Sequence, residues 1–174
     1  TCESSNEPTG IEVSLAVKSG DYRPFSEKCF DVLKYFNPKP IVHNDSQLQS
    51  KIDTWDVKPV MLTDNWALIY TGQSYYRTSP LKVVMGNVAY TINLDALPVG
   101  TGMRDYVHSF SGMEILIKAP IGAVKNSASR EALDYNPKTQ SWLFKALADF
   151  KEQVGAELSK QMESAETMWD ALMM

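Results

Sequence analysis

A chain of 174 residues is long enough for one domain of ordinary size with a buried core. Its 17 basic and 21 acidic side chains give a formal net charge of −4 at pH 7, which argues against nucleic acid as the main partner because phosphate binding usually leaves a basic surface. No apolar run approaches the roughly 18 residues of a membrane-spanning helix, and the N-terminal residues lack the apolar core of a signal peptide. Because the sequence does not start with Met, we expect a piece of a longer protein.

The cysteines and histidines predict no metal centre and no disulfide framework. Cys2 and Cys29 are the only two cysteines, which is too few for either. Cys29 falls on the apolar side of an expected helix, where a thiol behaves as a small core residue. His43 and His108 have no Cys, His or carboxylate at metal-ligand spacing. This cysteine usage fits a reducing, cytosolic compartment.

The first part of the chain predicts a lead, a strand and a helix. Residues 1–10 are polar and end in a turn, and residues 11–18 alternate apolar and polar side chains, as a half-buried strand does. A helix follows, with Asp21 as its N-cap and Pro24 in its first turn. The expected core-facing stripe of this helix consists of Phe25, Cys29, Val32, Leu33 and Phe36. Pro38 then ends the helix.

The middle of the chain predicts most of a β-sheet. Residues 46–52 favour either a short helix or a loop, and residues 59–62 a strand at a sheet edge. Trp66–Tyr70 has the composition of a strand, and residues 71–80 form a polar connection. Residues 82–92 contain two β-prone runs separated by Gly-Asn, the two residues that a tight hairpin turn requires.

Residues 97–112 predict the loosest part of the chain, because they contain three glycines and a proline. Gly100-Thr101-Gly102 invites comparison with a phosphate-binding loop, but it lacks the Lys and the strand-to-helix context of that motif. We therefore expect a plain loop at this point. Met113–Ala119 follows as a strand of the sheet.

The final helix is predicted to begin with Asn136 as N-cap and Pro137 as first helical residue. Its apolar stripe comprises Leu143, Leu147, Phe150, Val154, Leu158, Met162, Ala165, Trp169 and Leu172. A helix of about 35 residues would be roughly 50 Å long, more than a small sheet needs to cover it. Two interpretations stay open: one helix, broken near Gly155, that packs on its own domain, or an apolar end at residues 162–174 that meets a partner.

The connection between the strand at 113–119 and the final helix contains the candidate functional residues. We expect a short helical turn here, with Ser127 and Ser129 as candidate caps and Arg130 at its start. The N-terminus of a helix carries partial positive charge, so an Arg there is either solvated or faces an anion. A phosphate would suit the guanidinium fork. The alternative is an exposed Arg in a polar turn.

The same connection carries a resemblance to a known family. The sequence Asn-Ser-Ala-Ser-Arg-Glu-Ala-Leu at residues 126–133, followed by Asp-Tyr-Asn-Pro-Lys-Thr, resembles the signature of bacteriophage rIIA-like proteins. It is also similar to the Ser-Arg-Glu segment in the middle domain of the large ATP-dependent heat-shock chaperone. Both belong to the GHKL ATPase class. The hairpin at 82–92 resembles a strand of the rIIA-like family, and the Thr-Gly-Ile-Glu-Val at residues 9–13 resembles the last strand of its nucleotide-binding domain.

The resemblance implies a division of the chain. Residues 1–18 would be a lead and the last strand of a GHKL nucleotide-binding domain. Residues 19–174 would be a transducer-like α+β domain, similar to domain 2 of ribosomal protein S5, with its C-terminal helix at 137–172. The family's ATP- and Mg²⁺-binding motifs do not occur in this sequence, so ATP and Mg²⁺ would be bound by an N-terminal domain that this chain lacks.

The resemblance also implies roles for the residues around Arg130. Arg130 would be the catalytic contact to the terminal phosphate of ATP, supported by Asn126, Ser127 and Ser129. Topoisomerase-type relatives use a Lys in the equivalent loop, which makes Lys125 a weaker candidate for the same contact. The chaperone has a Gln four residues after its Arg, whereas this chain has an Asp there, which puts that polar contact in doubt.

For function, the resemblance implies an early phage protein that protects the phage against host or prophage exclusion by ATP-driven conformational change. It would act in the host cytoplasm, with association to a membrane surface left open. Its partners would be its own N-terminal ATP-binding domain and, as further candidates, a second copy or a host protein. The alternative is a non-enzymatic interaction module that self-associates or docks to a host protein or membrane surface.

Overall fold

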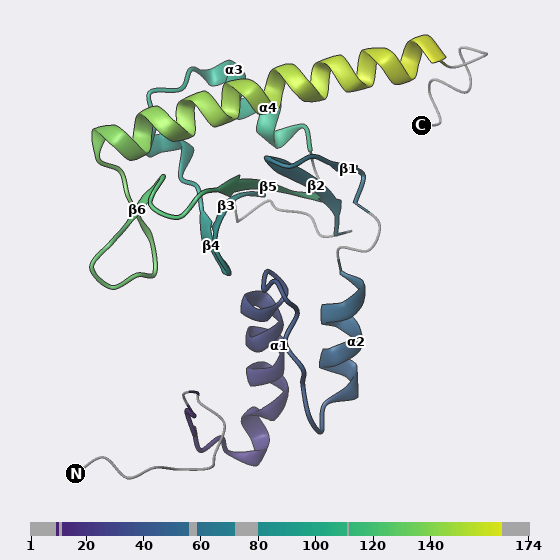
Figure 1. Cartoon of the computed structure of the whole chain (residues 1–174), viewed down its shortest axis with the longest axis vertical. Helices are drawn as coiled ribbons and strands as arrows, with labels where there is room; N and C mark the ends of the chain where they lie inside the picture. The colour runs from purple at the N-terminus through teal and green to yellow at the C-terminus, as the bar shows by residue number, and fades with distance from the viewer. Residues whose placement is uncertain (1–9, 11, 56–58, 72–79, 111, 165–174) are drawn as a thin grey trace.

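The computed structural model describes residues 10, 12–55, 59–71, 80–110 and 112–164. These residues form a mixed α+β domain, as the sequence predicts. A five-stranded sheet lies between the long helix α4 (Pro137–Ser164) on one face and the helices α1 (Tyr22–Leu33) and α2 (Ser46–Thr54) on the other (Figure 1). The finer likeness to domain 2 of ribosomal protein S5 stays a prediction.

The sheet has the strand order β1-β2-β5-β3-β4. Its strands are β1 (Met61–Leu62), β2 (Trp66–Tyr70), β3 (Leu81–Met85), β4 (Val88–Thr91) and β5 (Met113–Ala119). β5 pairs antiparallel with β2 and parallel with β3, so it is the central strand. Because the central strand is covered on both faces, β5 is buried along most of its length.

Shorter elements connect the sheet and the helices. They are the 3₁₀ turns η1 (Ser19–Asp21) and η2 (Leu94–Ala96), the helix α3 (Thr101–His108), and the two-residue strands β6 (Lys125–Asn126) and β7 (Leu133–Asp134). β6 and β7 pair with each other in a small antiparallel hairpin that is separate from the main sheet. This hairpin lies between β5 and α4 in the sequence.

Helix α4 covers one face of the sheet and forms the main core with it. The side-chain Oδ1 of Asn136 accepts the backbone N–H of Thr139 at 3.0 Å, and Pro137 is the first helical residue, so the predicted start is confirmed. Fully buried apolar residues recur at three- and four-residue spacing: Leu143, Leu147, Phe150 and Val154. They pack on sheet residues that include Leu68, Val83, Ile115 and Ile117. The helix runs unbroken through Gly155, so the break considered there is wrong.

A smaller apolar cluster lies on the opposite face of the sheet. Its buried members are Tyr35, Ala67, Ile69 and Leu116, with Trp55, Val84 and Ala89 packed around them. Tyr35 comes just after α1, and Trp55 is the C-cap of α2, so both helices meet the sheet through their C-terminal ends (Figure 1). None of the residues of α1 itself is buried, and α2 buries Leu48 and Ile52.

Most local predictions in the sheet are confirmed. The strand at 66–70 and the strand at 113–119 have the predicted bounds. The predicted hairpin is β3–β4, and Gly86 has the positive φ of 65° that its two-residue turn requires. Residues 46–54 form the helix that the sequence left open, and β1 takes up part of the predicted edge strand.

The strand predicted at 11–18 is wrong for its described residues. Residues 12–18 have no regular secondary structure, and Val13 and Leu15 are 76% and 70% exposed. An alternating pattern becomes a strand only where a neighbouring strand supplies hydrogen bonds and a face to cover. Within the part of the chain that the structure describes, no strand pairs with this segment.

The stripe predicted on α1 is only partly buried. Phe25 and Val32 are 43% and 56% exposed, and Cys29 is half-buried rather than a core residue. The helix also ends at Leu33, before Phe36. The reason is the end-on arrangement, because α1 contacts α2 along one side but presents only its C-terminal end to the sheet.

The loop predicted at 97–112 is wrong in its central part, where α3 forms. Gly100 is the N-cap residue, and the helix begins at Thr101. Gly102 inside the helix costs about 1 kcal/mol relative to Ala. The helix nevertheless forms because Val107 is fully buried in the main core, so tertiary packing outweighs local preference.

Some predictions fall outside the described residues. They concern the lead at 1–9, most of the polar connection at 71–80, and the end of the final helix at 165–172. Among the helices that the structure does describe, none combines the length and the apolar character needed to cross a lipid bilayer.

Candidate functional site

Arg130 lies in the loop of the β6–β7 hairpin. The hairpin pairs Lys125 with Asp134 and Asn126 with Leu133, and residues 127–132 connect the two strands. Leu133 is buried in the main core, whereas Arg130 is exposed. The hairpin therefore holds Arg130 at the surface while one of its own strands is anchored in the core.

The helical turn predicted around Arg130 is wrong, because the segment is a hairpin loop. The N–H of Ser127 donates to the carbonyl of Ala132 at 2.8 Å, and the N–H of Arg130 donates to the carbonyl of Ser127 at 2.9 Å. Arg130 has a φ of 61°, in the left-handed region that side chains other than Gly seldom adopt. The loop closes on itself and leaves no helix N-terminus at this point.

The two serines predicted as caps brace the loop instead. The hydroxyls of Ser127 and Ser129 lie 3.1 Å apart, and the N–H of Ala132 donates to Ser127 Oγ at 3.4 Å. The first contact lies just before Arg130 in sequence, and the second spans it. They help to hold the backbone of Arg130 in its left-handed conformation.

Lys125 is engaged with a carboxylate. Its Nζ lies 3.3 Å from Asp134 Oδ2, and the side chains are 68% and 40% exposed. An exposed pair of this kind adds little stability, but it reduces the charge that Lys125 offers to another anion. Asn126 is half-buried and has a backbone partner in β7. Of the predicted residues, Arg130 therefore presents the most available positive charge.

The base of the hairpin is tied to the first turns of α4. The N–H of Lys125 donates to the hydroxyl of Thr139 at 3.0 Å, and Thr139 is 1% exposed. The Nζ of Lys138 donates to the carbonyl of Gly122 at 3.0 Å. Together with the burial of Leu133 in the main core, these bonds attach the hairpin to the core and to the long helix.

The exposed guanidinium of Arg130 can bind an anion. No ion pair joins Arg130 to a carboxylate of the described chain, so its guanidinium is available to a ligand. The described residues also contain no group of three or more His, Cys, Asp or Glu side chains that could hold a metal ion.

A buried ionic cluster on the other face of the sheet escaped prediction. Glu114 of β5 is 0% exposed, and its carboxylate accepts from Lys34 Nζ at 3.1 Å, Lys82 Nζ at 2.7 Å and the Tyr35 hydroxyl at 2.5 Å. The Nζ of Lys82 also donates to the Tyr35 hydroxyl at 2.6 Å. The aromatic rings of Tyr35 and Trp55 lie about Lys34, with its Nζ 4.9 and 5.0 Å from their centroids.

Burial and charge oppose each other in this ionic cluster. Burial alone would raise the pKa of Glu114, but the ammonium groups of Lys34 and Lys82 outweigh it and hold that pKa below its usual value. Burial lowers the pKa of Lys34, and the neighbouring ammonium of Lys82 acts in the same direction against the attraction of Glu114. Two ammonium groups lie beside one carboxylate, so their positive charges favour the ionised form of Glu114.

One sequence signal could have indicated this cluster. Glu114 is a carboxylate inside the apolar run at 113–119, and a charge in a buried central strand requires a cation beside it. Lys82 stands at the start of another β-prone run, which makes it a natural partner. Nothing in the sequence indicated that Lys34 would be a partner, because it lies 80 residues from Glu114 in the chain.

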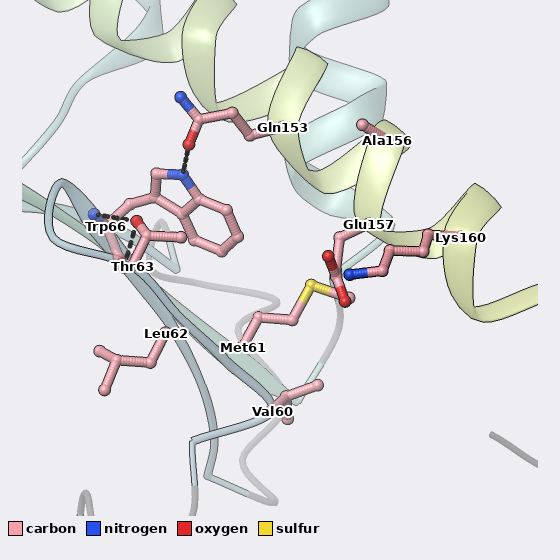
Figure 2. A pocket seen from close by; sticks show the side chains of 9 residues that line it. All are labelled: Val60, Met61, Leu62, Thr63, Trp66, Gln153, Ala156, Glu157 and Lys160. Atoms are coloured by element: carbon pink, nitrogen blue, oxygen red, sulfur yellow. Dashed lines mark hydrogen bonds between the residues drawn. The ribbon is translucent and has the colours of Figure 1, made fainter.

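A separate hollow lies between β1 and the C-terminal half of α4 (Figure 2). The Nε1 of Trp66 donates to Gln153 Oε1 at 2.7 Å at one side of it, and Met61 and Lys160 are among the residues that line it. Arg130 precedes the first turn of α4, whereas Gln153 is 16 residues beyond Pro137, or about 24 Å along the helix axis. The hollow is therefore not part of the Arg130 loop.

The fold and the loop define a mixed α+β domain with an exposed, rigidly mounted Arg. Comparisons with family models, with curated proteins and with solved structures found no match to this chain.

Proposed function

We propose that this chain is the transducer-like domain of an rIIA-like GHKL ATPase, and that Arg130 contacts the terminal phosphate of ATP held by the nucleotide-binding domain. The observation that carries the proposal is the state of Arg130. It is exposed, it has no ion pair in the described chain, and it occupies a left-handed backbone position braced by Ser127. Strained backbone at an exposed cation is characteristic of functional loops.

The chemistry of phosphoryl transfer explains why such a residue is useful. Negative charge spreads over the transferred phosphoryl group in the transition state, and a guanidinium stabilises it by paired N–H donors. An Arg that arrives only when two domains close links hydrolysis to conformation. The bond from Lys125 to Thr139 of α4 and the burial of Leu133 in the main core suit this role, because a movement of the sheet with α4 would move Arg130 as well.

The other predicted residues take secondary roles in this proposal. Ser127 and Ser129 shape the loop, and their hydroxyls lie within the same six-residue connection as Arg130. Lys125 stays a weaker candidate for the phosphate contact because Asp134 partly neutralises it. ATP and Mg²⁺ would be held by the nucleotide-binding domain. The role in phage protection against exclusion rests on the sequence resemblance.

The test is ATP turnover by the intact protein, with Arg130→Ala compared with the wild type. We expect a loss of kcat on the order of 10³-fold, as for other Arg contacts to a transferring phosphoryl group, with ATP affinity largely retained. Arg104→Ala is the matched control, because Arg104 is an Arg of α3 that pairs with Asp95 outside the hairpin. Unchanged turnover in Arg130→Ala would reject the proposal.

A second candidate function, a non-enzymatic interaction module, is favoured by apolar side chains near the hollow in Figure 2. Val60 and Leu62 are 46% and 62% exposed and line the hollow between β1 and the C-terminal half of α4. Exposed apolar groups that gather at one place are typical of interaction surfaces. Unchanged turnover in Arg130→Ala, together with loss of self-association in Leu62→Asp, would support this function instead.

A further inference from the structure

The helices α1 and α2 form an arm that meets the sheet over a small area. They contact each other, Leu48 and Ile52 of α2 are buried, and the C-terminal ends of both helices face the sheet (Figure 1). Because no residue of α1 itself is buried, the seat of the arm is limited to the residues that follow α1 and α2, chiefly Lys34, Tyr35 and Trp55. The apolar part of this contact is the small cluster in which Tyr35 and Trp55 pack on the sheet.

The buried ionic cluster lies at that seat. Lys34 and Tyr35 belong to the arm, whereas Glu114 and Lys82 belong to strands β5 and β3 of the sheet. The bonds from Lys34 to Glu114, from Tyr35 to Glu114 and from Lys82 to Tyr35 all cross between the arm and the sheet. The contact between the two parts therefore includes a buried polar cluster beside the small apolar one.

A contact that contains buried charges differs from a purely apolar one in the free energy that it costs to move the arm. A small slide of the arm would leave buried charges without partners, which is strongly unfavourable, so the seated arm has one well-defined position. Full separation would allow water to hydrate Glu114, Lys34 and Lys82, which offsets much of the loss. The contact therefore favours two states, seated and released, over intermediate positions.

The path of the chain gives this seat a consequence for Arg130. β5 leads directly into the hairpin that carries Arg130, and Glu114 is a residue of β5. In the proposed function the nucleotide-binding domain precedes α1, so its chain connection to the sheet runs through the arm. The position of the arm on the sheet would then determine the position of Arg130 relative to the nucleotide.

We propose that Glu114, Lys34, Lys82 and Tyr35 form a latch that seats the α1–α2 arm on the sheet and thereby positions Arg130 for its contact with the terminal phosphate of ATP. They are positioning residues, because they act through the arm and the sheet. The positioning role rests on the proposed function, whereas the latch itself depends only on contacts within this chain.

The latch is tested by amide hydrogen exchange on the 174-residue chain. In Glu114→Gln we expect the amides of α1 and α2 to exchange about tenfold faster, while those of β2, β5 and α4 keep their rates. Equal acceleration in all elements, or no acceleration in α1 and α2, would reject the latch. Tyr35→Phe removes only a hydroxyl and should give the same pattern with a smaller amplitude, so the test stands even where Glu114→Gln does not fold.

The positioning role is tested by ATP turnover in the intact protein. Tyr35→Phe should lower kcat about tenfold with KM for ATP unchanged, because a misplaced catalytic group affects the chemical step rather than nucleotide binding. Asp95→Asn, which breaks an exposed ion pair with Arg104, should change neither constant. Selective exchange in α1 and α2 with unchanged kcat in Tyr35→Phe would reject the positioning role. Unchanged turnover in Arg130→Ala would reject the proposed function, and the exchange experiment would still decide the latch.

Discussion

Arg130 holds a backbone conformation that costs free energy, and its neighbours maintain it. A left-handed φ costs a residue with a Cβ roughly 1–2 kcal/mol, whereas Gly adopts it freely. Here the value is 61°, and bonds to Ser127 and between Ser127 and Ala132 close the loop around it. The loop therefore contains strain at the same residue that presents the exposed charge.

Replacing Arg130 by Gly should separate stability from function. We expect the free energy of unfolding to rise by about 0.5 kcal/mol, because the relief of backbone strain exceeds the entropy that Gly gains in the unfolded chain. Urea unfolding of the chain measures this change. Ala132→Gly, in the same loop but without a left-handed φ, should lower the free energy of unfolding. If Arg130→Gly lowered the free energy of unfolding as much as Ala132→Gly does, the backbone of Arg130 would not be strained.

Because Glu114 is a buried carboxylate with a lowered pKa, we expect the free energy of unfolding to depend on pH in the acid range. Burial would raise its pKa, but Lys34 and Lys82 favour the carboxylate more strongly, so the folded pKa lies below its usual 4.5. A carboxyl with a lowered folded pKa binds more protons when unfolded, so its contribution is fully present above pH 4.5 and is lost as the pH falls through the folded pKa. The facing groups are Lys34 and Tyr35 from the end of α1 and Lys82 from β3.

The measurement compares urea unfolding of the wild type and Glu114→Gln from pH 7 to pH 3. The wild type should be the more stable at neutral pH, and the difference between the two proteins should shrink as the pH falls below 4.5. Asp134→Asn, which removes an exposed carboxylate paired with Lys125, serves as control and should give a smaller difference. A difference between wild type and Glu114→Gln that does not change with pH would contradict the assignment.

At the scale of elements, the long helix α4 and the turn that it contacts contain glycines that respond to substitution in opposite ways. Gly155 lies inside α4, and a methyl group added to its Cα would have no atom within 4 Å apart from the adjacent backbone of its own helix, so it would meet open space. Gly122 lies in the turn that Lys138 of α4 contacts, and its φ is +82°. One glycine weakens its helix, and the other is required by its turn.

Gly155→Ala should therefore raise the free energy of unfolding by about 0.5–1 kcal/mol, because Ala is the better helix former and has room. Gly122→Ala should lower the free energy of unfolding by about 1 kcal/mol, because Ala is strained at a positive φ. Thermal and urea unfolding of the two variants provide the check. A stabilised Gly122→Ala would contradict the turn geometry.

The elements also show where a local sequence pattern is sufficient to predict a helix or a strand. Trp66–Tyr70, the β3–β4 hairpin and the start of α4 at Pro137 are set by local signals, namely β-prone runs, a Gly-Asn turn and an Asn cap, and these were predicted correctly. The pattern at 12–18 failed because a strand needs a partner strand. The α3 segment failed in the opposite sense, because burial of Val107 overcomes an unfavourable Gly.

The role of the candidate site residues stays a prediction, and the geometry of their loop differs from the helical turn that we expected. Arg130 and its neighbouring serines were selected by resemblance, yet their left-handed loop depends on hydrogen bonds that no pattern encodes. The cluster around Glu114 is further from prediction, since Lys34 and Lys82 come from distant parts of the chain. The Glu114 cluster forms because β3 and β5 are neighbours in the sheet, and the sequence alone did not determine the order of the strands.

At the scale of the whole molecule, the proposed function places the nucleotide on another domain and assigns a single cation, Arg130, to this one. Arg130 is exposed on a loop, and the described residues contain no metal-binding group to accompany a nucleotide. Nucleotide sites usually combine several donors, a metal and a surface for the base. A single guanidinium in water gives only a weak contact with phosphate.

We therefore expect the 174-residue chain alone neither to bind nor to hydrolyse ATP in the presence of Mg²⁺. Isothermal titration calorimetry with ATP and Mg²⁺ should show no saturable binding, and phosphate release should stay at the level of buffer. The intact protein, measured beside it, should bind ATP and lose turnover in Arg130→Ala. A micromolar Kd for ATP in the isolated chain would contradict this expectation, since Arg130 would then belong to a nucleotide site formed within the domain itself rather than to a contact made on closure.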